Sequence, residues 1–380
     1  MAVRTDLFTS PDYFLTDELF TEEQKLIRDA VRAYVKKEIS PIIEEYAQRS
    51  AFPRQIVPQM GALGCFGPTI PQEYGGGGLD HISYGLMMQE LERGDSGVRS
   101  TASVQGSLVM YPIFEFGSEE QRKKYLPLLA AGEWLGCFGL TEPDHGDHVV
   151  LNGAKMWISN APEAQLAVVW AKDENEEIRG LLVERGMEGF STPLTHGKWS
   201  LRASCTGELV FDNVKVPKQN ILPNVKGLKG PLSCLTKARY GISWGALGAA
   251  MDCYDTALRY SLERTQFGRP IAGFQLQQKK LAEMITEITK AQLLNWRLGK
   301  LMDEHKATPQ QVSMAKRNAC EIAADIAREA RQMLGAMGIT GEYPVMRHMM
   351  NIESVITYEG THDIHLLITG MDITGVNAFK

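Results

Sequence analysis

The sequence lacks the features that mark secreted, membrane-spanning and nucleic-acid-binding proteins. Its six cysteines lie far apart and form no C-x-x-C pair, which favours reduced, mostly buried thiols over a disulfide framework. No apolar run reaches 18 residues, so no membrane span is predicted. The 46 acidic residues outnumber the 40 basic ones, and this net charge of −6 argues against nucleic acid as a partner.

The first 19 residues also carry no targeting signal. They contain Asp6, Asp12, Asp17 and Glu18 and no apolar core, unlike a signal peptide or an arginine-rich transit peptide. We therefore expect an intracellular protein, cytoplasmic and of bacterial type. A mature mitochondrial-matrix form is the alternative.

The hydrophobic periodicity of the 380 residues changes twice along the chain. Capping boxes at Thr21 and Ser118 open helical segments in the first third, and Pro41 is expected to interrupt or end the first helix. Short strands are expected at 166–170, 180–183 and 208–214, and long helices at 281–302 and 311–334. The fold class is therefore α+β and mainly α: a helical domain (1–135), a β domain (136–226) and a helical bundle (227–380).

The run of four glycines from Gly75 to Gly78 is the one segment that suggests a phosphate loop. No Gly-Lys-Ser/Thr follows it and no strand precedes it, so we interpret it as a turn.

Glu359 stands where one helix gives way to the next. Gly360 relaxes the backbone there and Thr361 can cap the following helix, so the carboxylate can project into a cleft as a general base. A surface or capping acid is the alternative. Glu359 and His362 also have the ligand spacing of di-iron bundles, but no second helical Glu-x-x-His exists, so no metal is predicted.

Three further groups of residues suit ligand binding. Arg99, among small residues that include Ser100 and Ser103, can clamp a carboxylate or form an internal salt bridge to Glu92 or Asp95. Trp157, beside Ser159, can flank a flat heteroaromatic ring or pack in the core. The third group suits a pyrophosphate because it combines Arg, Gln and glycine backbone: Arg264, Gln266, Phe267, Gly268, Gln332, Gly335 and Gly338.

The order of four motifs resembles the acyl-CoA dehydrogenase family over nearly the whole chain. These motifs are Thr141-Glu142-Pro143, Trp157-Ile158-Ser159-Asn160, Arg264-Thr265-Gln266-Phe267-Gly268 and Tyr358-Glu359-Gly360-Thr361. Within the family, segments 92–100, 138–141, 238–241 and 359–365 resemble the glutaryl-CoA dehydrogenases most closely.

The resemblance implies FAD as the cofactor, a C-terminal four-helix bundle and a homotetramer. It implies that the residues binding FAD, some of them from a neighbouring subunit, are Phe138, Leu140, Thr141, Trp157, Ser159, Arg264, Gln266, Phe267, Gln332, Gly335, Thr361 and Asp363. It implies that the substrate is bound by Glu92, Arg99, Ser100, Ser103, Tyr358 and Arg239, the last on the CoA side. Electron-transferring flavoprotein would accept the electrons.

The implied reaction is α,β-dehydrogenation of glutaryl-CoA, followed by decarboxylation to crotonyl-CoA. Glu359 would remove the α-proton, the β-hydrogen would leave as hydride to flavin N5, and Arg99 with Ser103 would hold the distal carboxylate. A short-chain acyl-CoA dehydrogenase or oxidase on the same scaffold is the alternative. A non-catalytic FAD- or CoA-binding protein is an alternative of a different class.

The chain departs from the family pattern at several places. Gly94 and Val98 replace a bulkier aliphatic residue and a tyrosine, and Gly335-Ala336-Met337-Gly338 replaces Gly-Gly-Asn-Gly. After Gly146 a Ser-Asp and about a strand and a turn of sequence are missing, including a serine that usually touches the FAD phosphates. Because the flanking motifs are intact, we expect that the given sequence omits this segment; a true deletion, which would weaken FAD binding, is the alternative.

Overall fold

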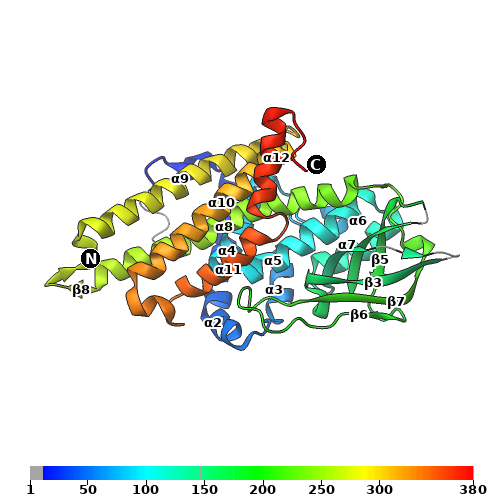
Figure 1. Cartoon of the computed structure of the whole chain (residues 1–380), viewed down its shortest axis with the longest axis horizontal. Helices are drawn as coiled ribbons and strands as arrows, with labels where there is room; N and C mark the ends of the chain where they lie inside the picture. Colours follow the sequence, from blue (N-terminus) through cyan, green and yellow to red (C-terminus); the bar gives the residue numbers. More distant parts are fainter. Residues whose placement is uncertain (1–11, 142, 145–147, 174, 380) are drawn as a thin grey trace.

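The computed structural model describes residues 12–141, 143–144, 148–173 and 175–379. Helices precede and follow a β region in the chain. In space the strands lie at one end of an elongated molecule, and the long C-terminal helices extend to the other end (Figure 1). This arrangement agrees with the α+β, mainly α class expected from the periodicity.

The N-terminal region consists of short helices. They are α1 (Glu22–Tyr34), α2 (Ser40–Arg49), α3 (Ile56–Ala62), α4 (His81–Gly94), α5 (Ser96–Ser103), α6 (Tyr111–Phe116) and α7 (Glu119–Ala130). Both predicted capping boxes are present, at Thr21 and Ser118. Gly75, at φ +83°, follows a short helical turn, which confirms the predicted turn among the four glycines.

Pro41 does not end the first helix. A π-helical stretch from Val35 to Ile39 joins α1 directly to α2, and Pro41 lies in the first turn of α2. The wider turn supplies an irregularity at which the missing N–H of proline is tolerated. The expected interruption of the α-helix is therefore present as the π-helical stretch, whereas the expected end of the helix was wrong because the chain stays helical through this point.

The middle region contains two packed sheets. The strands are β1 (Gly136–Thr141), β2 (Pro143–Asp144), β3 (His148–Ser159), β4 (Leu166–Lys172), β5 (Ile178–Glu184), β6 (Phe190–Ser191) and β7 (Thr206–Pro217). One sheet has the order β1-β4-β5, with β1 parallel to β4, and the other has the order β2-β3-β7-β6. Apolar side chains from both sheets form one buried cluster, and the three predicted strands lie within β4, β5 and β7.

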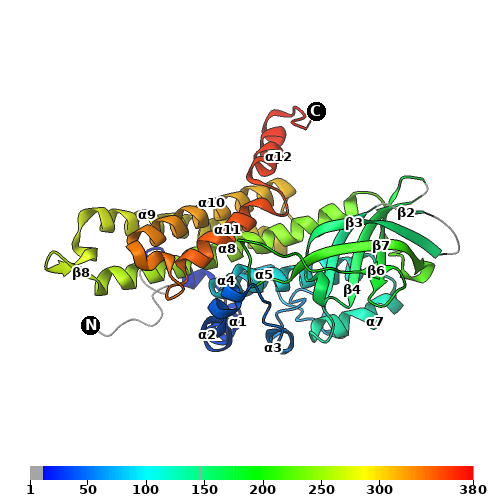
Figure 2. The same ribbon diagram turned by 60° about the horizontal axis from the view of Figure 1, so that its bottom comes forward.

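The C-terminal region is a bundle of long helices. It contains α8 (Lys229–Glu263), α9 (Gln275–Asp303), α10 (Pro309–Met333), α11 (Val345–Thr357) and α12 (His362–Thr374). A small hairpin of β8 (Thr265–Gln266) and β9 (Arg269–Pro270) joins α8 to α9. Figure 2 shows that α12 projects away from the body of the bundle, whereas α8 runs from the bundle toward the sheets.

Glycines bring α8 close to the N-terminal helices. A Cβ atom on Gly245 of α8 would lie 2.1 Å from Oε2 of Glu92, and one on Gly85 of α4 would lie 2.5 Å from the ring of Trp244. Both distances are far inside van der Waals contact, so neither glycine can be replaced without movement. This close approach buries Glu92 and Arg99 beneath α8.

All six cysteines are free and buried, as predicted. In the described part of the chain, no helix is long and apolar enough to cross a membrane. Within the same residues, no three or more His, Cys, Asp or Glu side chains are arranged to hold a metal ion.

Candidate active site

Glu359 lies in the short loop between α11 and α12, which confirms the predicted helix break. Its backbone is left-handed, at φ +53°, and that of Gly360 follows at φ +101°. Left-handed backbone is uncommon for a residue other than glycine, and it persists where the surroundings over-determine it. Thr361 caps α12 as predicted, because its Oγ1 accepts a hydrogen bond from the N–H of Ile364 at 3.4 Å.

Three cationic side chains surround the Glu359 carboxyl: Arg99 from α5, Arg239 from α8 and Lys316 from α10. Burial nevertheless raises the pKa of Glu359, and the three cations reduce that rise by stabilising the carboxylate. Its Oε2 atom is sealed from solvent and has no hydrogen-bond partner among the described residues. A poorly solvated carboxylate with an unused oxygen is suited to accepting a proton from a weak acid.

Arg99 forms the internal salt bridge that was one of its two sequence-based interpretations. Its Nε donates to Oε2 of Glu92 at 2.5 Å, and its NH2 donates to the hydroxyl of Tyr358. Arg99 is 1% exposed and Glu92 is fully buried. Asp95, the other suggested partner, pairs with Arg347 instead, at 2.8 Å.

Several polar atoms beside Arg99 are unsatisfied within the described structure. Oε1 of Glu92 and Oγ of Ser103 are buried and have no hydrogen-bond partner. Ser100 is also buried, one residue beyond Arg99. Buried polar groups are normally paired, so orphaned ones in a single cluster indicate a place for a polar ligand.

A cavity of about 590 Å³ adjoins the Glu359 loop, between the end of β3, residues 197–206 and α11. Its walls include the rings of Trp157, Trp199 and Tyr358, together with Ser159 and Thr206. Trp157 is 65% exposed, so its indole is not a core residue, which was the alternative interpretation. Exposed aromatic rings around a cavity of this size fit a large, flat heteroaromatic group.

The expected cofactor residues on β1 can be described only in part. Phe138 is half-buried on this strand, and its backbone pairs with Val168 of β4. Leu140 and Thr141 also pair with β4, but their side chains lie outside the described structure. Residues 145–147, where the family's Ser-Asp segment is missing from the given sequence, lie outside the described residues as well.

The other expected cofactor residues lie in two further places. Thr361 and Asp363 begin α12, next to the Glu359 loop. Arg264, Gln266 and Phe267 lie at the hairpin end of the bundle, far from the sheets, and Gln332 and Gly335 lie where α10 ends, at the same end of the bundle (Figures 1 and 2). One chain therefore does not bring these five residues to the cavity beside Glu359.

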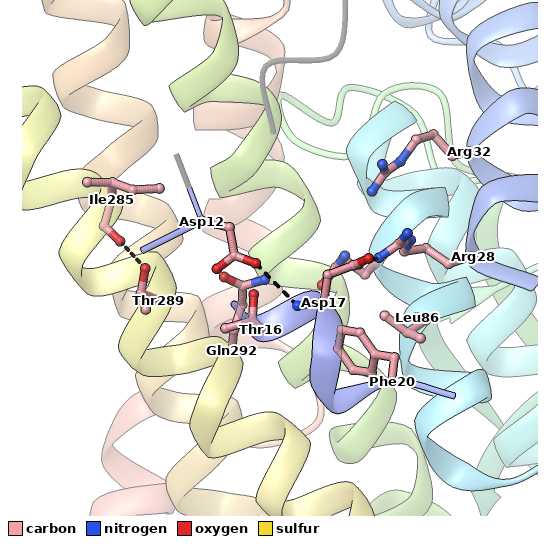
Figure 3. Close-up of a pocket in the computed structure, with 11 residues that line it drawn as sticks. Asp12, Thr16, Asp17, Phe20, Arg28, Arg32, Leu86, Ile285, Thr289 and Gln292 are labelled. Atoms are coloured by element: carbon pink, nitrogen blue, oxygen red, sulfur yellow. Dashed lines mark hydrogen bonds and ion pairs between the residues drawn. The ribbon is translucent and has the colours of Figure 1, made fainter. Parts of the chain in front are cut away.

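A second hollow, of about 150 Å³, is distinct from this site (Figure 3). Its walls come from the segment that precedes α1 and from α1, α4 and α9. Its two arginines are already paired: Arg28 with Asp17 and Asp29, and Arg32 with Glu90 at 2.9 Å. It shares no lining residue with the Glu359 site.

Sequence reasoning missed two residues that build the site, Gly245 and Lys316. Gly245 had no local signal, because its role depends on a contact between helices far apart in the sequence. Lys316 did have one: with Val312 and Cys320 it has i, i+4 spacing on a buried helical face, where a lysine is unusual.

Comparison with known proteins agrees with this geometry. Family models for the N-terminal, middle and C-terminal domains of acyl-CoA dehydrogenases match residues 21–133, 141–214 and 226–374. The chain belongs to the acyl-CoA dehydrogenase family.

Its relatives include enzymes with two different substrate names. The human mitochondrial short-chain specific acyl-CoA dehydrogenase is 35% identical over 367 residues, which cover 91% of this chain and 89% of that protein. A crystal structure of glutaryl-CoA dehydrogenase from Mycobacterium smegmatis is 48% identical, with a TM-score of 0.93 and 96% and 97% coverage. A second M. smegmatis glutaryl-CoA dehydrogenase, in complex with FADH2, is 44% identical, with a TM-score of 0.95 and 97% and 98% coverage.

Proposed function

We propose that this protein is an FAD-dependent acyl-CoA dehydrogenase that oxidises glutaryl-CoA and releases CO2 to give crotonyl-CoA. The single observation that carries the proposal is the position of Glu359. Its Oε2 atom is buried and unused, its carboxyl feels the charge of Arg99, and the preceding residue, Tyr358, lines the cavity with the aromatic rings.

Glu359 removes the α-proton of the thioester. This proton is only weakly acidic, and a carboxylate whose pKa is raised by burial is a stronger base toward it than an exposed one. The backbone N–H of Glu359 is the chain's donor to the thioester oxygen, which becomes negative as the proton leaves. Bound FAD supplies the acceptor for the β-hydrogen, which leaves with its electron pair.

Arg99 binds the distal carboxylate of the substrate. A planar guanidinium is suited to a carboxylate, and the unpaired Ser103 hydroxyl is a second donor at the same place. Loss of the α-proton and the β-hydride gives glutaconyl-CoA, and breaking the bond to its carboxylate then releases CO2. The electron pair left behind is protonated to give crotonyl-CoA. Glu92 and Tyr358, both in contact with Arg99, belong to this polar network.

The aromatic cavity, lined by Trp157 and Ser159, would hold the flavin ring, and Phe138, Leu140 and Thr141 of β1 are the further residues expected to bind it. Thr361 and Asp363 bind the same cofactor from α12. In a homotetramer, the other end of the bundle would contact the adenosine pyrophosphate of the FAD that is bound in a neighbouring subunit. The residues that would do so are Arg264, Gln266 and Phe267 of the hairpin, with Gln332 and Gly335. The electrons then pass to electron-transferring flavoprotein.

Replacing Arg99 tests the substrate assignment. Arg99→Ala is expected to lower kcat/KM for glutaryl-CoA at least about tenfold more than for butyryl-CoA, because only glutaryl-CoA presents a carboxylate to the vacated site. Steady-state rates on both thioesters check this, and butyryl-CoA is the internal control for general damage to the site. Equal losses on both would make Arg99 structural and favour a short-chain acyl-CoA dehydrogenase, as the human relative suggests.

A further inference from the structure

Three consecutive backbone carbonyls around the catalytic loop are held by two cationic side chains. Nζ of Lys316 donates to the carbonyl of Tyr358 at 2.9 Å and to that of Gly360 at 2.7 Å. Nε of Arg239 donates to the carbonyl of Glu359, between them, at 2.6 Å. The backbone on each side of Glu359 is therefore fixed by donors from α10 and α8.

Lys316 is fully buried, yet no carboxylate in the described structure forms an ion pair with it. Burial of an unpaired ammonium is costly, and burial lowers the pKa of Lys316. In the described structure its hydrogen bonds go to the loop that carries Glu359. A lysine is unfavourable on the otherwise apolar, buried face of α10. Its presence there is explained if Lys316 supports the left-handed backbone at Glu359.

The charged and titratable groups that face the Glu359 carboxyl come from every element packed around it. They are Arg99 on α5, Arg239 on α8, Lys316 and Cys320 on α10, Tyr84 on α4, and Tyr358, which directly precedes Glu359 in the loop. His365 of α12 lies under Gly360, where burial and the two nearby cations lower its pKa to about 3, so it is uncharged. Lys316 therefore combines a positive charge near the carboxylate with direct hydrogen bonds to both flanking carbonyls.

We propose that Lys316 is a positioning residue for the general base: its ammonium clamps the Tyr358 and Gly360 carbonyls, aims the Glu359 carboxylate at the substrate and favours the ionised form of that carboxylate. This role rests on the proposed dehydrogenase activity. It predicts that Lys316 acts on the proton-transfer step and has little effect on binding of the thioester.

The test compares Lys316→Met with Lys316→Gln in the flavin-loaded enzyme. Methionine keeps an unbranched apolar side chain and removes the charge and both donors, whereas glutamine keeps an N–H donor without the charge. We expect kcat with glutaryl-CoA or butyryl-CoA to fall about tenfold or more in Lys316→Met, and less in Lys316→Gln, with KM within about twofold. Loss of the cation raises the pKa of Glu359, so the acidic limb of the kcat/KM profile moves to higher pH in both variants.

The matched control is Arg317→Met, which removes the next cation along α10. Arg317 pairs with Glu321 on the surface at 2.8 Å, and in the described part of the chain it forms no hydrogen bond with residues 358–361. Its kcat and pH profile are expected to equal those of the wild type. Urea midpoints and flavin absorbance show whether each variant is folded and loaded, and Lys316→Gln carries the test if Lys316→Met does not fold.

The outcomes separate this inference from the proposed function. A wild-type enzyme that oxidises neither thioester would contradict the proposed function itself. If the wild type is active and a folded Lys316 variant shows the same acidic limb in its kcat/KM pH profile, the positioning role is overturned, whatever the kcat of the variant. A loss confined to KM would overturn it as well.

Discussion

At the scale of single residues, the burial that raises the pKa of Glu359, the proposed base, also destabilises the folded chain. Burial raises the pKa of its carboxyl, so the folded state binds this proton more tightly than the unfolded state does. At a pH above the raised value, folding must keep an ionised carboxylate in a poorly solvated place. The cost disappears as the pH falls below the ordinary glutamate pKa of about 4.3, where both states are protonated.

Glu359→Gln should therefore lose activity and gain stability. We expect at least about a hundredfold lower turnover, the scale of losing a general base, with the flavin still bound. Near pH 8 the variant should unfold at a higher urea concentration than the wild type, because glutamine imitates the protonated acid. This difference should shrink as the pH falls toward about 4. Urea titrations at several pH values measure it, and an equal difference at every pH would refute the electrostatic explanation.

The residues themselves were predictable where chemistry has a local signature. Glu359 was found because a glycine and a capping threonine follow it, and Arg99 because small residues surround it. The sequence could not decide whether Arg99 forms an internal salt bridge or is free to bind the carboxylate of a ligand, because Glu92 contacts Arg99 only through the packing of the helices. Lys316 had a local signal as a lysine on a buried helix face, but its role could not be predicted because its partners are backbone carbonyls more than forty positions away.

At the scale of elements, the contact between α4, α5 and α8 determines where Arg99 lies. Gly245 leaves just enough room for the carboxylate of Glu92 and the side chain of Arg99 to lie against α8. A larger residue must displace either the helix or the ion pair. The geometry of the proposed site for the substrate carboxylate therefore depends on the absence of a side chain at Gly245.

Gly245→Ala tests this dependence. Overpacking of this kind is expected to cost about 1–3 kcal/mol in the free energy of unfolding. The control is Gly370→Ala on α12, where a Cβ meets nothing within 4 Å and alanine should add about 0.5–1 kcal/mol of helix stability. Thermal or urea unfolding of both variants compares them. A neutral Gly245→Ala would show that the contact is looser than described.

The elements were largely predictable because their signals are local. Capping boxes gave the starts of α1 and α7, and the change from helical to alternating periodicity gave the β region. Pro41 misled because proline usually breaks a helix, whereas here a π-helical stretch precedes it. Which strands pair and which helices meet depends on contacts between distant segments, and periodicity does not contain that information.

At the scale of the whole molecule, two groups of the proposed cofactor residues lie far apart. Trp157 and Ser159 line the cavity near the sheets, whereas Phe267 lies on the hairpin at the other end, with 92% of its surface exposed (Figure 1). In the proposed homotetramer, a second subunit brings the hairpin end of one chain to the aromatic cavity of another. Within the chain the ring of Phe267 makes an edge contact with the ring of Phe274, at 6.2 Å between centroids, and the assembly would cover the rest of this exposed side chain.

Phe267→Ser should therefore weaken both assembly and flavin retention. Burying a phenylalanine contributes about 1.5–3 kcal/mol, so flavin affinity is expected to fall about tenfold or more. Leu26→Ser, at a leucine that is 71% exposed on α1, is the control and should change neither property. Sedimentation and flavin titration measure the two effects. Unchanged flavin binding in Phe267→Ser would remove this residue from the cofactor site.

The measurement that tests the central claim most directly is an anaerobic half-reaction of the purified flavoprotein. The wild type and Glu359→Gln are each mixed with glutaryl-CoA and with butyryl-CoA, and the visible flavin absorbance and the released CO2 are followed. We predict fast bleaching of the wild type by glutaryl-CoA, with CO2 released, and at least about a hundredfold slower bleaching of Glu359→Gln. Bleaching mainly by butyryl-CoA would contradict the substrate assignment, and equal rates in both proteins would contradict Glu359 as the base.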